Sequence, residues 1–296
     1  MAALIGQQRF LESFGLSPQV LQVADGTRIL AAIVSGSVDL SLMSGFGQVF
    51  SAIEHGAPLK ILAGGALRPT LALFSSKSSV RTLTDLVGRT VGTGSIGALV
   101  YQLTVTLLRK YQIDTARVRF VNIGSSADIA RAVSAGVVDA GAADASLTGA
   151  SEAFRAHLIE HGDMSAELPD YTFQAAWTSQ RSIANHRDLL VRALAAAAKL
   201  YRFAQAPGSR AAFLAARRSV FPRASDHELE AAWNFVQTAK PFAVDLTLTP
   251  ERLRQVQESN VRFGVQRAAL PFERVADMSL ASEALRLLEA VAPRRS

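Results

Sequence analysis

Short apolar runs alternate with amphipathic helical patterns through the first half of the chain. The apolar runs favour buried strands, and the segments between most of them carry apolar residues at helical spacing. This alternation predicts an α/β fold with mainly parallel sheets. Strands are predicted over residues 20–23, 38–42, 59–63, 71–74, 90–92, 118–121 and 138–142. Helices are predicted over residues 4–14, 27–35, 45–55, 83–86, 97–111 and 126–135.

The second half of the chain is mainly helical after one more strand, predicted over residues 171–177. Two helix starts carry clear signals. Ser225 with Glu228 three residues later resembles a capping box, and Thr249 stands before Pro250 as a cap residue before a first-turn proline. Helices are predicted over residues 187–204, 210–217, 226–235, 250–263 and 279–290.

An internal repeat connects two distant parts of the chain. Residues 23–39 align without a gap onto residues 123–139, and each copy reads as a strand, a polar turn, a helix, a glycine and a second strand. One copy is a βαβ unit rather than a domain. Two such units far apart favour two similar α/β lobes, although one large sheet that contains both is the alternative. The identical pairs are Ile29 and Ile129, Ala32 and Ala132, Gly36 and Gly136, Val38 and Val138, and Asp39 and Asp139.

Composition and charge disfavour or exclude several functional classes. The chain has 296 residues, 49% of them hydrophobic, and a formal net charge of +6. Its basic residues are scattered rather than clustered beside aromatic residues, which disfavours a nucleic-acid binder. The absence of cysteine excludes thiolate nucleophiles, disulfides and cysteine metal sites. Neither a bilayer-spanning apolar run nor a signal peptide at residues 1–10 is recognisable in the sequence.

Four motifs together resemble a known family. Residues 30–39, 56–63, 83–92 and 132–140, in this order and spacing, are similar to the periplasmic solute-binding proteins of nitrate, sulfonate, taurine and thiamine-precursor ABC transporters. The resemblance spans about residues 4–205. It implies the type II periplasmic-binding-protein fold, with a ligand cleft between two lobes and a helical C-terminal region. It further implies a periplasmic location, an ABC-transporter permease as partner, and the lobes 1–75 with 178–296 and 76–177.

The sequence departs from this family in two respects. The family begins with a signal peptide and a first strand whose end lines the cleft, whereas here only the following helix, residues 4–14, is expected. This start is typical of a processed, truncated or misannotated product, and the loss of the strand would weaken lobe one and its binding. The family's aromatic-rich ligand wall is also missing, and Phe46 is the main aromatic residue placed near the cleft.

The turns that follow the predicted strands carry the candidate binding residues. In open α/β sheets, ligands bind beyond the carboxyl ends of strands, where the free N–H groups of helix starts attract anions. The strongest candidate is residues 93–97, because two hydroxyls and two glycines before a long helix favour an oxyanion nest. A plain capping turn is the alternative. The predicted ligand-binding residues are Ser44, Gly45, Phe46, Gly65, Arg68, Thr93, Gly94, Ser95, Ile96, Gly124, Ser125 and Asp144.

Individual roles follow from side-chain chemistry. Ser44 is expected to donate a hydrogen bond to the ligand or to cap the next helix, and Phe46 to cover an apolar part of the ligand. Gly65 allows close approach of the backbone. Arg68 is either a bidentate partner for a carboxylate or sulfonate or, as the more common case, a solvated surface residue.

The two turns of the repeat and the turn at Asp144 are expected to play different roles. Residues 124–126 can reach the ligand, whereas Asp25 in the equivalent turn would repel an anion and is interpreted as a cap. Asp144 is expected to line the cleft, or to meet an amine if the ligand is zwitterionic. These expectations favour a small ligand held mainly by hydroxyl and backbone groups.

Neither catalysis nor metal binding is expected. His157 and His161 are at helical spacing with Glu160 between them, but a metal requires further ligands, so a solvated helix face is favoured. The sequence contains neither a Gly-x-Ser-x-Gly elbow nor an ordered Ser/His/Asp triad. Trp177 and Trp233 are interpreted as packing residues. The sequence therefore predicts no catalytic residue, no metal and no cofactor.

The predicted function is non-catalytic capture of a small anionic organic solute, such as a sulfonate or carboxylate, for uptake by an ABC transporter. The protein is expected to be a monomer that binds no nucleic acid. One alternative is an enzyme on the same scaffold, either a desulfinase, whose cysteine nucleophile is absent here, or a thiamine-pyrimidine synthase that uses a cofactor-linked lysine. Another is the ligand-sensing domain of a regulator, which would require a flanking DNA-binding or spanning helix.

Overall fold

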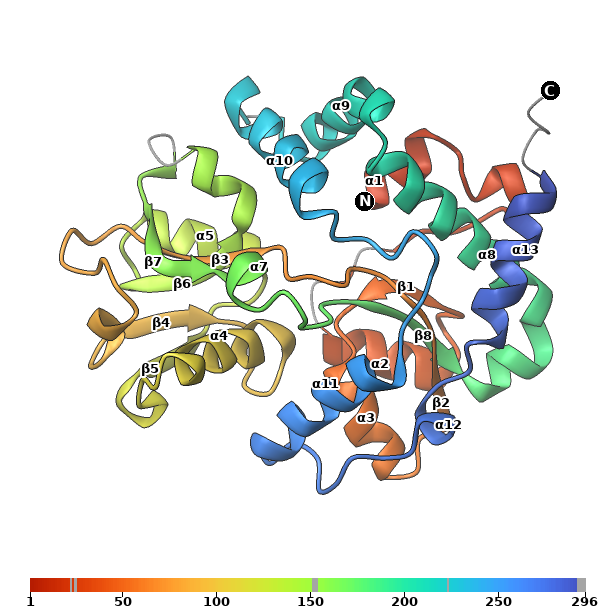
Figure 1. Cartoon of the computed structure of the whole chain (residues 1–296), viewed down its shortest axis with the longest axis horizontal. Helices are drawn as coiled ribbons and strands as arrows, with labels where there is room; N and C mark the ends of the chain where they lie inside the picture. Colours follow the sequence, from red (N-terminus) through yellow and green to blue (C-terminus); the bar gives the residue numbers. More distant parts are fainter. Residues whose placement is uncertain (22, 24–25, 151–153, 223, 292–296) are drawn as a thin grey trace. The chain divides into compact units, whose positions relative to one another are not determined.

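The computed structural model describes residues 1–21, 23, 26–150, 154–222 and 224–291 of the chain (Figure 1). The fold is mixed α/β with two sheets and a helical C-terminal region, as predicted. The chain divides into two compact units. Unit 1 comprises Met1–Leu67, Thr172–Arg223 and Lys240–Ser296, and unit 2 comprises Arg68–Tyr171 and Ala224–Ala239.

These units differ from the predicted lobes at three segments. Residues 68–75 belong to unit 2 because their strand pairs within its sheet, and residues 172–177 belong to unit 1 for the same reason. Residues 224–239 also belong to unit 2, where the helix Asp226–Ala239 packs against residues 145–150, although they follow unit 1 helices in the sequence. Apolar periodicity identifies a helix but does not say which sheet the helix covers.

The sheet of unit 1 has three strands in the order β1-β8-β2. They span Ser41–Ser44 (β1), Ala175–Ser179 (β8) and Leu59–Gly64 (β2). The central strand β8 runs antiparallel to both neighbours. β1 and β2 therefore run in the same direction, and Ala175 at the start of β8 pairs with the last residue of each.

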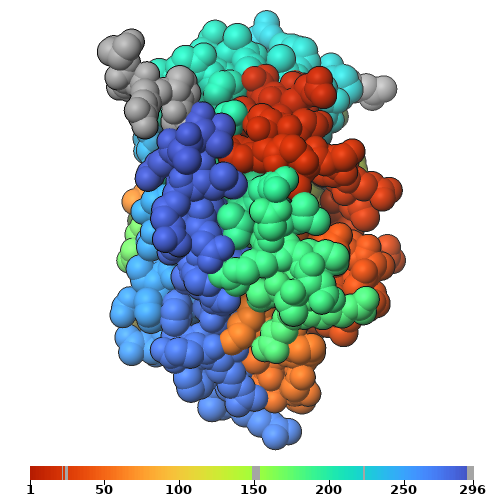
Figure 2. Space-filling model, turned by 90° about the vertical axis from the view of Figure 1, so that its right-hand side faces the viewer, coloured from red at the N-terminus to blue at the C-terminus, as the bar shows by residue number. Residues whose placement is uncertain are grey.

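Helices surround this sheet within unit 1. Trp177, at the centre of β8, is fully buried in a core to which α3, α11 and α12 contribute. Along α13 the buried residues Leu280, Ala281, Ala284 and Leu288 form one apolar face, which packs on α8 (Figure 2). The helices are α1 (Ala2–Gln7), η1 (Glu12–Phe14), α2 (Gly26–Ser35), α3 (Gly47–Glu54), α8 (Gln180–Ala204), η5 (Pro207–Ser209), α9 (Arg210–Val220), α11 (Pro250–Arg262), α12 (Phe272–Val275) and α13 (Ser279–Val291).

The sheet of unit 2 has five strands in the order β5-β4-β6-β3-β7. β4 is parallel to β5 and β6, whereas β3 is antiparallel to β6 and β7. The strands are β3 (Leu71–Ser75), β4 (Thr90–Thr93), β5 (Arg119–Asn122), β6 (Ala140–Asp144) and β7 (His157–Asp163). The helices are η2 (Thr84–Leu86), α4 (Leu99–Lys110), η3 (Thr115–Arg117), α5 (Ser126–Ser134), η4 (Ala145–Ala150), α7 (Met164–Glu167) and α10 (Asp226–Ala239).

The direction of the strands is therefore only partly as predicted. Parallel pairing is confined to β5-β4-β6 among the described strands, and the sheet of unit 1 is antiparallel. A short apolar run indicates a strand but carries no information on the direction of its neighbour. A helical crossover is what imposes parallel pairing, and no helix separates β2 from β3 in the described chain.

In both copies of the repeat, the predicted helix and the glycine that follows it are present. Gly36 and Gly136 follow α2 and α5 with φ of 81° and 70°, a left-handed conformation that favours glycine. In unit 2, a Cβ on Gly141 would overlap the side chain of Ile129, so this glycine lets α5 pack directly on β6. The repeat thus encodes a helix stop in both units.

Two predicted elements at the N-terminus are wrong. Val20, Leu21 and Val23 are not in a strand and expose 50%, 56% and 37% of their surface. An apolar run becomes a strand only when a neighbour completes its hydrogen bonds. Gln22, in the same run, and Asp25 lie outside the described residues. The predicted helix 4–14 is divided into α1 and η1, with Arg9 between them at a φ of 51°.

Two histidines of the second half also differ from the prediction. His157 and His161 lie on β7, not on a helix, and His161 has a φ of 58°. Residues four positions apart lie on the same face of either a helix or a strand. The apolar residues that flank the two histidines were too few to distinguish these two elements. Within the described chain, no helix combines the length and apolar character needed to cross a membrane.

Candidate functional site

One edge of the unit 2 sheet collects most of the predicted binding residues. Because β4, β5 and β6 are parallel, their last residues, Thr93, Asn122 and Asp144, lie at the same edge. The Ile123 N–H donates to the Thr93 carbonyl over 2.8 Å, so the turns after β4 and β5 begin side by side. We call this the carboxyl edge of unit 2.

The turn at residues 93–97 precedes α4, as predicted, but its hydroxyls are partly engaged. Thr93 is 1% exposed, and its hydroxyl donates to the Gly94 carbonyl over 2.9 Å. Its hydroxyl therefore already has an acceptor within its own turn. Ser95 accepts a hydrogen bond from Asn122 Nδ2 over 3.2 Å, which leaves its own hydrogen for another acceptor. Ile96 is 77% exposed.

The start of α4 has no side-chain cap. The helix begins at Leu99, two residues later than predicted, and its N-cap residue is Ala98. In the described part of the chain, no side chain accepts a hydrogen bond from its first-turn N–H groups. The first N–H groups of a helix need an external acceptor, and together they attract negative charge. This helix start is therefore chemically suited to an anion.

The start of α5 lies at the same edge and is closed by its own side chains. Ser125 Oγ accepts from the Asp128 N–H over 3.2 Å, and Asp128 Oδ2 accepts from the Ser125 N–H over 3.1 Å, which is a capping box. Hydrogen bonds from Ser125 hold the pKa of Asp128 below its usual value. The carboxylate occupies the position that a bound anion would take. Ser125 therefore caps α5 in this structure.

Gly94, Gly124, Asp144 and Arg68 complete the carboxyl edge of unit 2. A Cβ on Gly94 would lie 3.5 Å from the Gly124 carbonyl oxygen, so these two turns approach closely. Asp144 Oδ1 accepts from the backbone N–H and the hydroxyl of Ser146, over 2.9 and 2.6 Å. Leu71 pairs with Asp144, so the exposed Arg68 precedes β3 at this same edge.

The corresponding edge of unit 1 is formed where β1 and β2 end. Ser44 and Gly64 both pair with Ala175 there, and Gly45 follows directly after β1. Ser44 Oγ accepts from Trp177 Nε1 over 2.8 Å and lies 2.6 Å from Ser41 Oγ. We call this the carboxyl edge of unit 1.

Two predicted residues of unit 1 serve the core instead. Phe46 is 1% exposed and packs edge-on against Phe50, with ring centroids 5.6 Å apart. It cannot cover a ligand while it fills this core. The Gly65 N–H donates to the Gln174 carbonyl over 3.0 Å, and its carbonyl accepts from the Ala243 N–H over 2.8 Å. Gly65 therefore allows close backbone packing and has no N–H left for a ligand.

Three polar residues at these edges were missed by the sequence reasoning. Asn122 ends β5, and its position after a predicted parallel strand was the available signal. Gln48 Nε2 donates to the carbonyls of Gly45 and Gly26, over 3.0 and 3.4 Å, and so connects the starts of α3 and α2. Trp177 supplies its indole N–H to Ser44 in addition to packing. Only the folded structure brings Gln48 and Trp177 to their partners.

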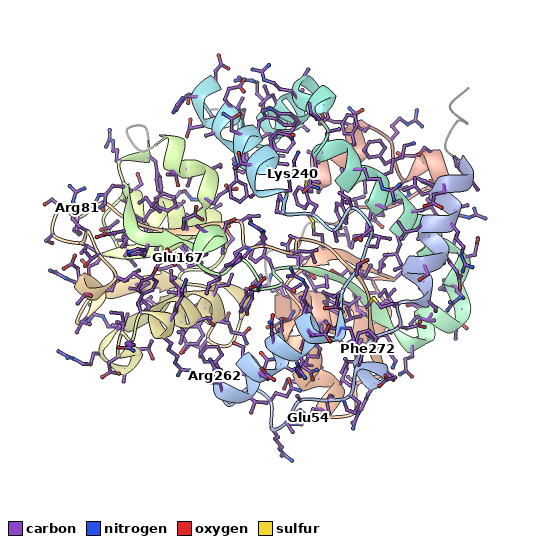
Figure 3. The ribbon with its side chains drawn as sticks, in the orientation of Figure 1. Glu54, Arg81, Glu167, Lys240, Arg262 and Phe272 are labelled. Carbon is purple, nitrogen blue, oxygen red and sulfur yellow. The ribbon has the colours of Figure 1, made fainter. Side chains whose placement is uncertain are left out.

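A polar cluster around Glu167 lies elsewhere in unit 2 (Figure 3). Its carboxylate accepts from Lys110 Nζ and the Tyr111 hydroxyl, over 2.7 and 2.6 Å, and lies 3.0 Å from His161 Nδ1. These partners, Lys110 first, lower the pKa of Glu167 to about 2. None of the predicted binding residues belongs to this cluster.

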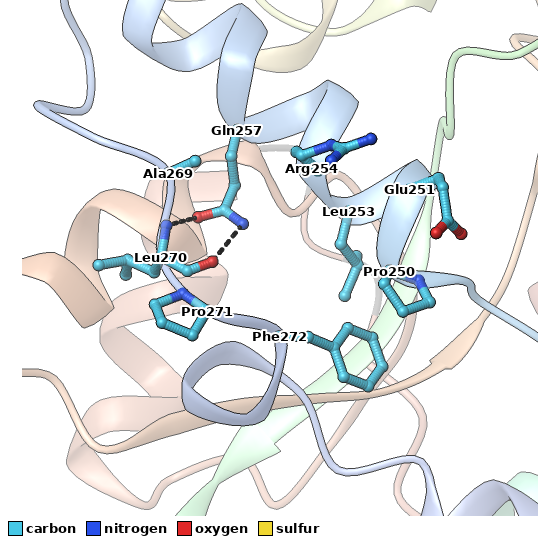
Figure 4. Close-up of a pocket in the computed structure, with 9 residues that line it drawn as sticks. All are labelled: Pro250, Glu251, Leu253, Arg254, Gln257, Ala269, Leu270, Pro271 and Phe272. Atoms are coloured by element: carbon cyan, nitrogen blue, oxygen red, sulfur yellow. Dashed lines mark hydrogen bonds between the residues drawn. The ribbon is translucent and has the colours of Figure 1, made fainter.

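A hollow of about 330 Å³ lies in unit 1 between α11 and residues 269–272 (Figure 4). Leu253 and Phe272 contribute apolar walls, while Gln257 bonds to the backbone N–H and carbonyl of Leu270 over 2.8 and 3.1 Å. Its lining contains none of the predicted ligand residues. Across the described residues, no three histidine, aspartate or glutamate side chains are grouped so that they could hold a metal ion.

The chain is similar to one protein family and to several solved structures. The family model described as NMT1/THI5 like matches residues 6–210. No curated protein sequence matches the chain. The alkanesulfonate-binding protein SsuA from Xanthomonas axonopodis pv. citri, bound to MOPS, is 21% identical, with a TM-score of 0.74 over 96% of this chain and 93% of that chain.

Two further structures share the fold. The ligand-binding component of an ABC-type import system from Staphylococcus aureus, with zinc bound, is 14% identical, with a TM-score of 0.76 over 96% of this chain and 94% of that chain. The desulfurization enzyme DSZB is 15% identical, with a TM-score of 0.70 over 96% of this chain and 95% of that chain. The predicted fold and the predicted family resemblance are therefore confirmed, whereas such low identities identify no ligand.

Proposed function

We propose that this chain, which belongs to the NMT1/THI5-like family, is the solute-binding component of an ABC import system and captures a small anionic organic solute. The observation that carries the proposal is the pair of carboxyl edges, one in each unit, where polar turns follow the strands. The same function is supported by the similarity, over nearly the whole chain, to a protein named as the ligand-binding component of an ABC-type import system and to one named for alkanesulfonate binding.

The chemistry of the edges favours an anion. In unit 2 the start of α4 offers first-turn N–H groups without a side-chain acceptor in the described chain, and Ser95 adjoins it. In unit 1 the Ser44 hydroxyl lies at the strand end and, when Ser41 donates to it, keeps its own hydrogen for the solute. The transporter is proposed to recognise the solute-bound form of the protein. The net charge of +6 attracts anions to the surface.

A sulfonate or a carboxylate is the proposed class of solute. Each presents two or three oxygens that can accept hydrogen bonds from N–H and hydroxyl donors, while its organic part needs no specific partner. Asp144 adds a negative charge at the edge of unit 2, so a zwitterion such as an aminosulfonate can place its ammonium there. The protein is proposed to work as a monomer on the periplasmic side of the membrane, together with a permease.

An enzyme on the same scaffold is the second candidate, because DSZB shares the fold. A desulfinase that uses a cysteine nucleophile is excluded by the absence of cysteine from the sequence. Release of sulfite from an aryl sulfinate would favour this candidate, and the absence of turnover together with saturable binding would favour the first.

Isothermal titration calorimetry with a sulfonate, a carboxylate, nitrate and a pyrimidine tests the proposal. We expect one-to-one binding of a member of the first two groups. A folded protein that gives no heat with any of the four groups contradicts the proposed function.

A further inference from the structure

We infer that Trp177 is a positioning residue, whose indole N–H orients the Ser44 hydroxyl so that this hydroxyl donates to an acceptor oxygen of the solute. The inference rests on the proposed function and adds to it a reason for the choice of ligand. The Ser44 hydroxyl already accepts hydrogen bonds from the protein. The protein would therefore select a solute that offers a hydrogen-bond acceptor to it.

The indole is fixed by burial on β8. Trp177 is 0% exposed, and its backbone pairs with Ser41 on one side and Ile61 on the other. A buried indole N–H requires an acceptor, and Ser44 Oγ provides it at 2.8 Å. An indole nitrogen can only donate, so Ser44 must be the acceptor in this contact. The direction of the bond is therefore set by chemistry alone.

Ser41 completes the arrangement. Its hydroxyl lies 2.6 Å from that of Ser44 and is 8% exposed, whereas Ser44 is partly exposed at the strand end. A hydroxyl has one hydrogen and two lone pairs. When Ser41 donates, both lone pairs of Ser44 are filled, by Trp177 and Ser41, and its hydrogen must point to a third group. An oxygen of a sulfonate or carboxylate is such a group.

The chain of hydroxyls discriminates between ligands by their hydrogen-bonding capacity. An anionic oxygen accepts the Ser44 hydrogen and completes a sequence from Ser41 through Ser44 to the ligand, in which each bond strengthens the next. A ligand ammonium needs a free lone pair on Ser44, which exists only when the bond between the two serines is reversed so that Ser44 donates to Ser41. The Ser41 hydrogen then needs another acceptor, which is unfavourable for a hydroxyl on a residue that is 8% exposed.

The test compares Trp177→Phe, Ser44→Ala and the double variant, with ethanesulfonate and ethylammonium as probes in calorimetry. Trp177→Phe keeps a large ring and removes the N–H. We expect ethanesulfonate affinity to fall about tenfold in Ser44→Ala and about fivefold in Trp177→Phe, since hydrogen bonds to charged groups are the stronger class. The double variant should bind no more weakly than Ser44→Ala, because Trp177 acts through Ser44. Trp233→Phe, on α10 of unit 2, is the matched control.

A second measurement examines the contact without any ligand. In protein labelled with ¹⁵N at tryptophan, the two indole resonances are assigned with Trp233→Phe. Ser44→Ala should move the Trp177 indole resonance upfield and leave that of Trp233 unchanged. An unmoved Trp177 resonance would overturn the inference, as would additive losses of affinity in the double variant. A wild-type protein that fails to bind ethanesulfonate contradicts the proposed function, whereas binding that is unchanged by Trp177→Phe contradicts only the inference.

Discussion

The starts of α4 and α5 lie at the same edge of the unit 2 sheet, but only the start of α5 is capped by side chains. At α5, Ser125 and Asp128 form a capping box that satisfies the helix start and places a carboxylate there. At α4, Ala98 has no side chain able to cap, and no described side chain replaces it. A helix start that is satisfied from within contributes stability, whereas one left open can bind an external anion. The difference separates a structural turn from a binding turn.

The largest expected effect comes from closing the open helix start. Ala98→Asp places a carboxylate where we propose that the anion binds. It should weaken ethanesulfonate binding by on the order of a hundredfold, because two like charges in one partly buried site repel strongly. The same variant should raise the melting temperature, because aspartate is a favourable N-cap residue. Calorimetry and thermal unfolding measure both effects.

Ala98→Asn is the matched control for this prediction. It supplies a cap without a full charge, so the gain in stability should remain while the loss of affinity becomes much smaller. Equal losses of affinity in Asn and Asp variants would show that the first-turn geometry matters and the charge does not. Unchanged affinity in both would contradict the assignment of α4 as an anion-binding helix start.

Glu167 extends the comparison to a carboxylate that is held by side chains of its own unit. The pKa of Glu167 is lowered to about 2 from an ordinary value of 4.5, mainly by Lys110 and Tyr111. A lowered carboxyl pKa contributes stability that is present above about pH 4.5 and lost as the pH falls through about 2. Glu167→Gln should therefore cost about 2 kcal/mol of unfolding free energy at pH 7, a value reduced for the exposure of Lys110.

Urea unfolding of wild type and Glu167→Gln at several pH values measures this contribution. The difference between the two proteins should shrink between pH 4.5 and 2, and ethanesulfonate affinity at pH 7 should stay the same. A difference that does not depend on pH over this range would contradict the ionised network around Glu167.

Opening the closed helix start should have a smaller effect. Ser125→Ala removes the cap hydroxyl of α5 and should lower the unfolding free energy by about 1 kcal/mol. Because Asp128 remains near the helix start, the affinity for ethanesulfonate should not increase. Urea unfolding and calorimetry test this together, and a gain in affinity would mean that the two helix starts are interchangeable.

The smallest effect is expected at the most exposed residue of the binding turn. Ile96 is 77% exposed, so Ile96→Ser should change the unfolding free energy by no more than about 0.5 kcal/mol. Ethanesulfonate, whose apolar part is short, should bind with unchanged affinity. A large loss would place Ile96 against the solute and revise the proposed contact surface in unit 2.

Patterns confined to a few neighbouring residues were predicted well. The helix of each repeat and its glycine stop follow from amphipathic spacing and from the left-handed conformation that Gly36 and Gly136 adopt. The capping box of Ser225 and Glu228 belongs to the same class, because it was predicted and is present. Local hydrogen bonds decide these features, and the residues that make them are adjacent in the sequence.

Features that depend on distant partners were predicted poorly. The run at residues 20–23 has strand-like composition, but its described residues lie outside the sheet. Phe46 follows a strand end as a ligand-facing residue would, yet its ring is drawn into a core built with α11 and α12. Trp177 was correctly interpreted as a packing residue, while its hydrogen bond to Ser44 depends on a register between segments 133 positions apart.

A crystal structure of the protein with bound ethanesulfonate tests the central claim most directly. The account predicts a sulfonate oxygen within hydrogen-bond distance of the first-turn N–H groups of α4 or of Ser44 Oγ. Ethanesulfonate bound only in the hollow beside α11, or held without either group, would contradict it.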